Sequence, residues 1–104
     1  MSTKQDHKRW RKQFNESCLI RDGHMCKFCN EIDVLNVHHI TNRHDMLNGG
    51  YATTNGITVC LDHHKECEDY LNGFSFDQTY CPNNLYEMIG SNYDQAFYDC
   101  ENLK

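Results

Sequence analysis

The sequence lacks the long apolar run that a membrane-spanning helix needs. Hydrophobic residues make up 38% of the chain and the mean hydropathy is -0.81. No stretch approaches the roughly 20 apolar residues that cross a bilayer. The first residues are charged, and no apolar segment typical of a secretory signal follows them. We therefore expect a cytoplasmic protein that has no membrane partner.

A surplus of positive charge is also missing. The chain has 10 Lys and Arg against 15 Asp and Glu, a formal net charge of -5, which argues against indiscriminate nucleic-acid binding. The charge is uneven, because residues 1–61 hold eight basic and six acidic side chains, whereas residues 62–104 hold two and nine. Residues 1–12 form a basic N-terminal arm, which is either a phosphate-contacting segment or a solvated face. Its cations are Lys4, Lys8, Arg9, Arg11 and Lys12.

The cysteine count excludes a pure disulfide framework, because seven is an odd number. Cys26 and Cys29 predict a tight knuckle, and Cys60 and His63 supply a second pair at a spacing typical of metal ligands. A Cys3His set of this kind binds structural zinc, with Cys67 as the alternative to His63. Outside this set we expect small buried residues or free thiols of a reducing compartment at Cys18, Cys67, Cys81 and Cys100.

A chain of 104 residues fits one domain, residues 1–104, whose modest core would gain stability from a bound metal. Trp10, Phe14 and Cys18 recur at the spacing of one helix face. This pattern predicts an amphipathic helix that ends near Asp22, with its aromatic residues in the core rather than on a base-stacking surface.

The last third of the chain predicts a C-terminal helical extension, residues 74–104. Turn residues separate its segments, and its helices are expected to pack on the core. The expected order is a loop over residues 74–82, a helix from Pro82 through Ile89 and a last helix over residues 93–100. A partner-binding role for this acidic region has no support in the sequence.

The densest chemistry falls in residues 37–68. In a helix expected there, His64 and Glu68 lie one turn apart on the same face. A hairpin that carries His38 and packs on this helix would bring two imidazoles and a carboxylate together. Three such ligands leave coordination positions open, which is typical of a catalytic metal site. The predicted elements are a strand over residues 34–40, a loop over 41–54, a strand over 57–60 and a helix over about 61–70.

The order of these motifs resembles the HNH endonuclease family, over roughly residues 10–70. The resemblance implies an α+β protein with a small ββα-metal fold, also called the HNH or His-Me finger. Flanking helices would surround a zinc knuckle and ββα-metal core in residues 26–70. The motifs that carry the resemblance are His38-His39-Ile40, Asn55-Gly56-Ile57-Thr58-Val59-Cys60, His63-His64 and the preceding Arg21-Asp22-Gly23.

The resemblance also assigns roles to single residues. His38 takes the position of a metal ligand, and His39 takes that of the general base that activates water. His38 and His39 cannot have the same role, because adjacent side chains of a strand point to opposite faces. Asn55 takes the position of the residue that braces the loop and holds the base. The implied cation, Mg²⁺ or Mn²⁺, is held by His38, His64 and Glu68, and two imidazoles also admit Ni²⁺ or Zn²⁺ in vitro.

The substrate that the resemblance implies is a phosphodiester in DNA, and double-stranded DNA is the expected partner. Two other functions stay open at this point: a zinc-stabilised DNA- or protein-binding module without catalysis, and a nuclease subunit of a larger assembly. The first has no need of a general base. The sequence leaves the oligomeric state and any protein partner open. Candidate DNA-binding residues are Lys8, Arg9, Arg11, Lys12 and Arg43.

Overall fold

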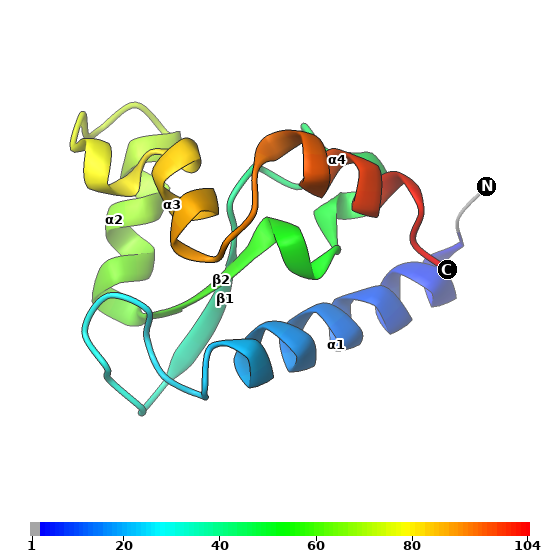
Figure 1. Ribbon diagram of the computed structural model, residues 1–104, viewed down its shortest axis with the longest axis horizontal. Coiled ribbons are helices and arrows are strands. Elements are labelled where there is room, and N and C mark those ends of the chain that lie inside the picture. The colour runs from blue at the N-terminus through cyan, green and yellow to red at the C-terminus, as the bar shows by residue number, and fades with distance from the viewer. Residues whose placement is uncertain (1–2) are drawn as a thin grey trace.

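The computed structural model describes residues 3–104 and has an α+β architecture (Figure 1). In this described part of the chain, a two-stranded antiparallel sheet lies among four α-helices, and three short 3-10 helices occur in the connections. Of the helices described, none has the length and apolarity that crossing a membrane would require. The elements are α1 (Lys4–Arg21), β1 (Leu35–His39), η1 (Leu47–Gly50), η2 (Thr53–Asn55), β2 (Gly56–Cys60), α2 (Leu61–Leu71), η3 (Gln78–Tyr80), α3 (Pro82–Met88) and α4 (Tyr93–Glu101).

From residue 4 onwards, the basic N-terminal arm forms the first half of α1; residues 1 and 2 lie outside the described part of the chain. The helix begins at a capping box. The Thr3 hydroxyl accepts from the Asp6 N–H, and the Asp6 carboxylate accepts from the Thr3 N–H, each at 3.1 Å. These two bonds satisfy N–H groups that a helix start otherwise leaves free. The cations of this segment are therefore held on a rigid element.

The sheet pairs β1 with β2 so that His38 lies opposite Ile57 and His39 opposite Gly56. Both strands agree with the prediction to within one residue at each end. Val34 is excluded from β1 because its φ is 47°, a left-handed conformation that interrupts an extended strand. β2 is buried along its whole length, so it lies at the centre of the packed structure although the sheet has only two strands.

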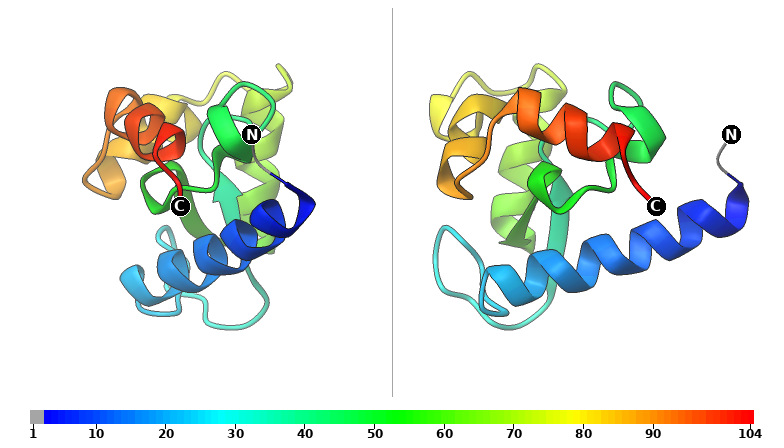
Figure 2. Two further views of the ribbon diagram at one scale, coloured as in Figure 1. Left: turned by 90° about the vertical axis from the view of Figure 1, so that its right-hand side faces the viewer. Right: turned by 45° about the vertical axis from the view of Figure 1, so that its right-hand side comes forward.

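Helices cover the sheet on both faces. In Figures 1 and 2, α1 crosses one face, whereas α2, α3 and α4 lie on the other side. One core cluster contains Trp10, Phe14, Cys18 and Tyr51; a larger one joins the sheet to the C-terminal helices through residues such as Ile57, Val59, Leu85, Tyr86 and Cys100. A Cβ atom at Gly56 would lie 2.5 Å from the Phe14 ring. Glycine at this position therefore lets α1 approach the sheet closely.

The predicted helices after β2 are present with small shifts of their ends. The helix expected at about 61–70 runs from Leu61 to Leu71, and the last two run from Pro82 to Met88 and from Tyr93 to Glu101. The two predicted loops are less irregular than expected, since η1 and part of η2 lie within residues 41–54 and η3 lies within residues 74–82. Short 3-10 turns have no hydrophobic periodicity long enough to be recognised in a sequence.

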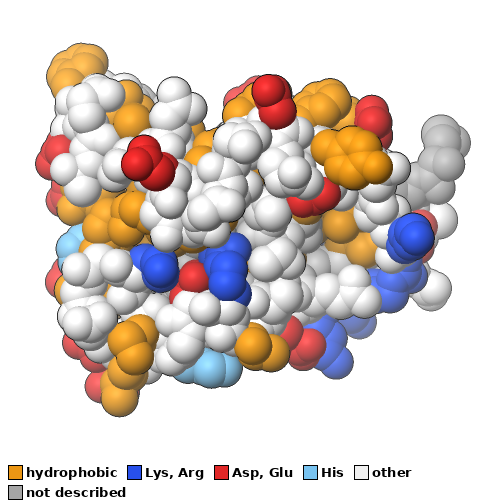
Figure 3. All heavy atoms as spheres, viewed as in Figure 1, with side chains coloured by type: hydrophobic (Ala, Val, Ile, Leu, Met, Phe, Trp, Pro, Cys, Tyr) orange, Lys and Arg blue, Asp and Glu red, His pale blue; other side chains and the backbone are white. Residues whose placement is uncertain are grey.

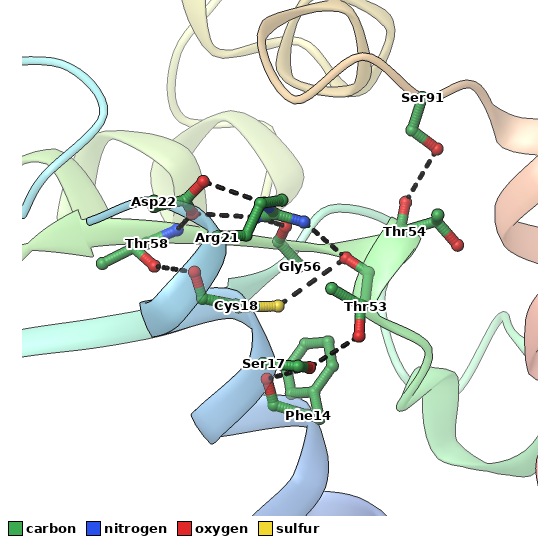
Figure 4. A network of polar contacts seen from close by, with 10 residues as sticks. All are labelled: Phe14, Ser17, Cys18, Arg21, Asp22, Thr53, Thr54, Gly56, Thr58 and Ser91. Atoms are coloured by element: carbon green, nitrogen blue, oxygen red, sulfur yellow. Dashed lines mark hydrogen bonds and ion pairs between the residues drawn. The ribbon is translucent and has the colours of Figure 1, made fainter. Parts of the chain in front are cut away.

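Arg21 and Asp22 join the end of α1 to β2 (Figure 4). The Arg21 guanidinium donates to both Asp22 carboxylate oxygens at 2.8 Å, and to the carbonyls of Thr53 at 2.7 Å and Gly56 at 2.6 Å. The Asp22 carboxylate also accepts from the Thr58 N–H at 3.0 Å. Burial raises the pKa of Asp22, but the hydrogen bonds from Arg21 and Thr58 outweigh it and leave the pKa below its usual value.

We expect Asp22→Asn to lower the free energy of unfolding by about 2 kcal/mol at neutral pH, because an amide cannot accept all of these charge-assisted bonds. Chemical denaturation measures the change. Since the folded-state pKa of Asp22 is lowered, its contribution is full above the ordinary value of 3.8 and is lost as the pH falls through the folded-state pKa. The difference from wild type should therefore shrink below pH 3.8. Glu16→Gln, an exposed change on the same helix, should have little effect. Equal losses of unfolding free energy in the two variants would contradict the role of Asp22 in joining α1 to β2.

Candidate metal centres

The predicted Cys3His set comes together where the cysteine knuckle meets the start of α2. The knuckle is a tight turn, in which the Cys26 N–H donates to the Glu31 carbonyl at 2.9 Å and Asn30 adopts a φ of 64°. Its Lys27 N–H donates to the Thr58 carbonyl at 3.0 Å, which holds the turn against β2. Cys60 ends that strand and directly precedes α2. The contact between the turn and β2 thus brings the two short cysteine motifs together.

The four ligand atoms lie within 4.8 Å of one another. The separations are 3.7 Å between Cys26 Sγ and His63 Nδ1, 3.2 Å between Cys60 Sγ and His63 Nδ1, and 3.7 Å between Cys29 Sγ and Cys60 Sγ. Thiolates at about 2.3 Å from a tetrahedral ion are about 3.7 Å apart, so this set has the size of a zinc site. The four residues could therefore hold a structural zinc ion.

The choice between His63 and Cys67 is settled by their positions on α2. The His63 ring stacks on Phe28 of the knuckle at a centroid distance of 5.0 Å, which turns its Nδ1 toward the sulfur atoms. Cys67 is fully buried in the core and belongs to no ligand cluster of the described residues. Burial raises the pKa of the Cys67 thiol to about 12, which disfavours the thiolate that binds metal. Cys18 and Cys100 are also buried, as expected.

A second group of possible ligands joins β1 to α2. Glu68 Oε1 lies 3.1 Å from His64 Nε2, one helical turn away, and 3.4 Å from His38 Nδ1 on the strand. The two imidazole rings meet edge to face with centroids 5.3 Å apart. The three ligand atoms lie within 4.8 Å of one another. The predicted hairpin and helix therefore bring together the two imidazoles and the carboxylate.

Of the three residues in this group, His38 has the surroundings most typical of a metal ligand. Its side chain is 1% exposed, yet neither ring nitrogen has a hydrogen-bond partner among residues 3–104, because the approach of Glu68 does not have hydrogen-bond geometry. Burial lowers the pKa of His38 to about 3, with smaller contributions from His64 and His39. The ring is thus neutral, the form that binds metal. A buried, unpaired imidazole costs free energy that coordination would offset.

His39 lies on the opposite face of β1, as strand alternation predicts. Its ring stacks on Phe14 at 4.6 Å and meets Tyr51 edge to face at 5.4 Å. Burial, and to a smaller extent Arg43, lower the pKa of His39 to about 4, against a hydrogen bond to the Gly49 backbone. Its Nε2 is buried and, within the described part of the chain, has no partner. The imidazole is therefore neutral at pH 7 and has one nitrogen available.

One surface hollow brings the two faces of β1 together. Its volume is about 270 Å³, and its lining includes His39 from the α1 side and His64 and Glu68 from α2, with Arg43 and His44 of the following loop at its side. Both sets of side chains reach it because β1 has α1 on one face and α2 on the other. A ligand in this hollow could contact His39, His64 and Glu68 at once.

Asn55 braces the loop between the strands. Its Oδ1 accepts from the Thr41 N–H at 3.0 Å and from the Tyr86 hydroxyl at 2.7 Å, and its Nδ2 donates to the carbonyls of Thr41 and Gly50 at 3.1 Å each. A Cβ atom at Gly50 would lie 2.8 Å from Asn55 Nδ2 and 3.2 Å from His39 Cδ2. Asn55 thus holds the backbone of Gly50, which lies beside the His39 ring.

Sequence reasoning missed Tyr86 and Tyr51 as parts of this site. Tyr86 comes from α3 and is 2% exposed, with its hydroxyl bonded to both Asn55 and Thr41. Tyr51 is 5% exposed and lies against His39. Each is one aromatic residue among several, with no motif around it. Only its apolar neighbours Leu85, Met88 and Ile89 could have marked Tyr86 as a core position.

The predicted DNA-binding residues separate in space. Lys8 and Arg11 line hollows along α1, and Arg43 lines the one beside His39. Arg9 instead pairs with Asp6 at 3.1 Å and lies over the Trp10 ring, and Lys12 is exposed. Neither Arg9 nor Lys12 lines any of the hollows described here.

Comparisons with known proteins give no assignment. No protein-family model matches the chain, and neither a curated protein nor a solved structure matches it significantly. The HNH resemblance therefore stays a prediction, and the arguments for function are the two ligand clusters and their surroundings.

We expect freshly purified protein to contain about one equivalent of zinc, because a closed Cys3His set binds the ion tightly. Cys29→Ala should weaken zinc binding by more than about 100-fold and lower the melting temperature. Metal analysis and thermal unfolding measure both effects. Cys81→Ala, a partly buried cysteine outside the cluster, is the control and should keep its zinc. Full zinc content in Cys29→Ala would refute the assignment.

Proposed function

We propose that this protein is a metal-dependent endonuclease of the HNH type that hydrolyses phosphodiester bonds in DNA. The observation that carries the proposal is the shared hollow, in which His39, with its unpaired Nε2, lies beside His64 and Glu68 of the second ligand group. A closed metal cluster alone would suit a binding module. A neutral base next to an open ligand set suits a hydrolase.

The fold supports the proposal through the order of its central elements. β1, the loop braced by Asn55, β2 and α2 follow one another as in the ββα arrangement that the resemblance implies. His38 and His64 come from the elements expected to supply metal ligands, and His39 lies on the opposite strand face. A structural zinc at the knuckle would fix the start of α2, which carries His64 and Glu68.

In the proposed reaction, His39 acts as general base. A water in the hollow loses a proton to His39 Nε2 and attacks phosphorus, the bond to the 3′ oxygen breaks, and that oxygen leaves and takes up a proton from solvent. The products carry 5′-phosphate and 3′-hydroxyl ends. The lowered pKa of about 4 keeps His39 unprotonated at neutral pH. Phe14 and Tyr51 hold the ring against rotation.

The residues that would hold the catalytic cation are His38, His64 and Glu68. The chemistry that a divalent cation supplies at such a site is neutralisation of charge on the phosphate and on the leaving oxygen. The set of two imidazoles and one carboxylate suits Mn²⁺, Ni²⁺ or Zn²⁺ by affinity, and Mg²⁺ by availability in cells. Arg43 adds positive charge on the wall of the same hollow.

Cleavage of supercoiled plasmid tests the function, and His39→Ala tests the mechanism. The wild type should nick or linearise plasmid with Mg²⁺ or Mn²⁺. His39→Ala should keep its zinc and fold but cut about 10²- to 10⁴-fold more slowly, because loss of a general base lowers only the chemical step. His24→Asn is the matched control, since His24 is exposed and its φ of 55° suits asparagine. It should cut as the wild type does.

Two results would count against this proposal in different ways. If the wild type leaves plasmid intact with Mg²⁺, Mn²⁺, Co²⁺ and Ni²⁺ at low salt, the stand-alone nuclease function fails, and the zinc-stabilised binding module or the subunit of a larger assembly takes its place. If the wild type cuts and His39→Ala cuts equally well, the function stands and the assigned base is wrong.

Glu68→Gln should raise the cation concentration needed for half-maximal cleavage by about tenfold, because a neutral amide binds a hard cation less well than a carboxylate does. A metal titration of the cleavage rate measures this change. Cys67→Ala is the neighbouring control: Cys67 lies in the core and outside the cluster, so the metal requirement should not change. His38→Ala and His64→Ala should likewise raise the metal requirement, with partial rescue by excess Mn²⁺. A metal requirement altered by Cys67→Ala and not by Glu68→Gln would reverse the ligand assignment.

A further inference from the structure

Three hollows follow one another from the proposed catalytic site along α1. The first is the site hollow with His39, and Arg43 and His44 also line the second, of about 470 Å³. His7 and Arg11 line the second and also the third, of about 550 Å³. Because each neighbouring pair shares two lining residues, the three hollows form a row in which each adjoins the next. We call it the α1 groove.

The α1 groove is lined by cations beyond the catalytic site. Among residues 3–104, no Asp or Glu lines its second or third hollow, whereas Lys4, Lys8 and Arg11 do. These three residues are spaced four and three apart, which places them along one face of the helix. On the face drawn in Figure 3, Lys and Arg side chains lie over the N-terminal half of α1 and in a second group left of the centre, whereas Asp and Glu side chains are scattered over the whole face.

Tyr51 fixes the groove relative to the proposed base. The Arg11 Nε–H donates to the Tyr51 hydroxyl at 3.3 Å, and the guanidinium lies 5.9 Å from the centre of the Tyr51 ring. The same ring meets His39 edge to face at 5.4 Å. Among residues 3–104, Arg11 forms this one hydrogen bond, through Nε, and it holds the side chain one aromatic ring away from His39. Its outer nitrogens remain for a ligand such as a phosphate, which guanidinium groups bind in a bidentate manner.

We propose that the α1 groove binds the sugar-phosphate backbone of the DNA strand next to the scissile phosphate. This inference rests on the proposed function, since the scissile phosphate lies beside His39 only if the site is a nuclease. The seven helical steps from Lys4 to Arg11 span about 10 Å, which equals the axial rise of about three nucleotides of one strand. A row of cations of that length suits a polyanion rather than a single small anion.

Binding of a labelled DNA duplex of roughly 20 base pairs, followed by anisotropy from about 50 to 200 mM KCl without added Mg²⁺ or Mn²⁺, tests the groove. The variants are Lys8→Gln with Arg11→Gln, which lie in the groove, and Arg9→Gln with Lys12→Gln, which do not line it. Each pair removes one lysine and one arginine from the same helix. Circular dichroism and zinc content verify that both variants fold.

The groove variant should lose about two units of the slope of log K against log salt, one for each lost phosphate contact, and more than about tenfold in affinity near 50 mM. The Arg9 and Lys12 variant should lose less than half as much. Equal losses in the two variants, or no salt-dependent binding by wild type, would overturn the groove. Cleavage is not needed for this measurement. A wild type that binds through the groove but never cuts plasmid would refute the proposed function and leave the groove as a DNA-binding surface.

Discussion

Burial of β2 is the constraint on which the rest of the structure depends. All five of its residues are buried. α1 is held against one face by the close approach of Phe14 to Gly56 and by the hydrogen bonds of Arg21 and Asp22 to β2. Each end of the strand meets a candidate centre. Asn55 and its loop precede it, and Cys60 ends it. A strand fixed in this way sets the distance between the knuckle cluster and the hollow beside His39.

The two ligand clusters are coupled through α2. His63 belongs to the Cys3His set and the next residue, His64, belongs to the second set. Adjacent helical residues differ by about 100° in direction, so one turn of helix serves two centres on different sides. A metal bound at the knuckle would hold the first turn of α2, and with it His64 and Glu68, against β1. In a small domain, metal binding at one centre would in this way fix the positions of the side chains at the other.

The C-terminal extension belongs to the site as well as to the core. Tyr86 bonds Asn55, and Asn48 Nδ2 donates to the Cys100 carbonyl at 2.8 Å. Thr54 donates to Asp99 at 2.8 Å, so α3 and α4 together hold the segment between the strands. That segment positions His39 through Gly49 and Gly50. The acidic helices α3 and α4 therefore support the segment between the strands. The basic face of α1 instead borders the hollows in which the proposed substrate would lie.

The sequence by itself determined the local features of this protein. The i, i+4 spacing of His64 and Glu68, the alternation of His38 and His39 and the cysteine knuckle depend on short-range chain geometry, which periodicity reports directly. Only the tertiary structure decided that His63 rather than Cys67 completes the cluster, that Tyr86 reaches Asn55 from α3, and that the basic segment is one helix with two different faces. These outcomes depend on how distant segments pack, and packing leaves no periodic trace in the sequence.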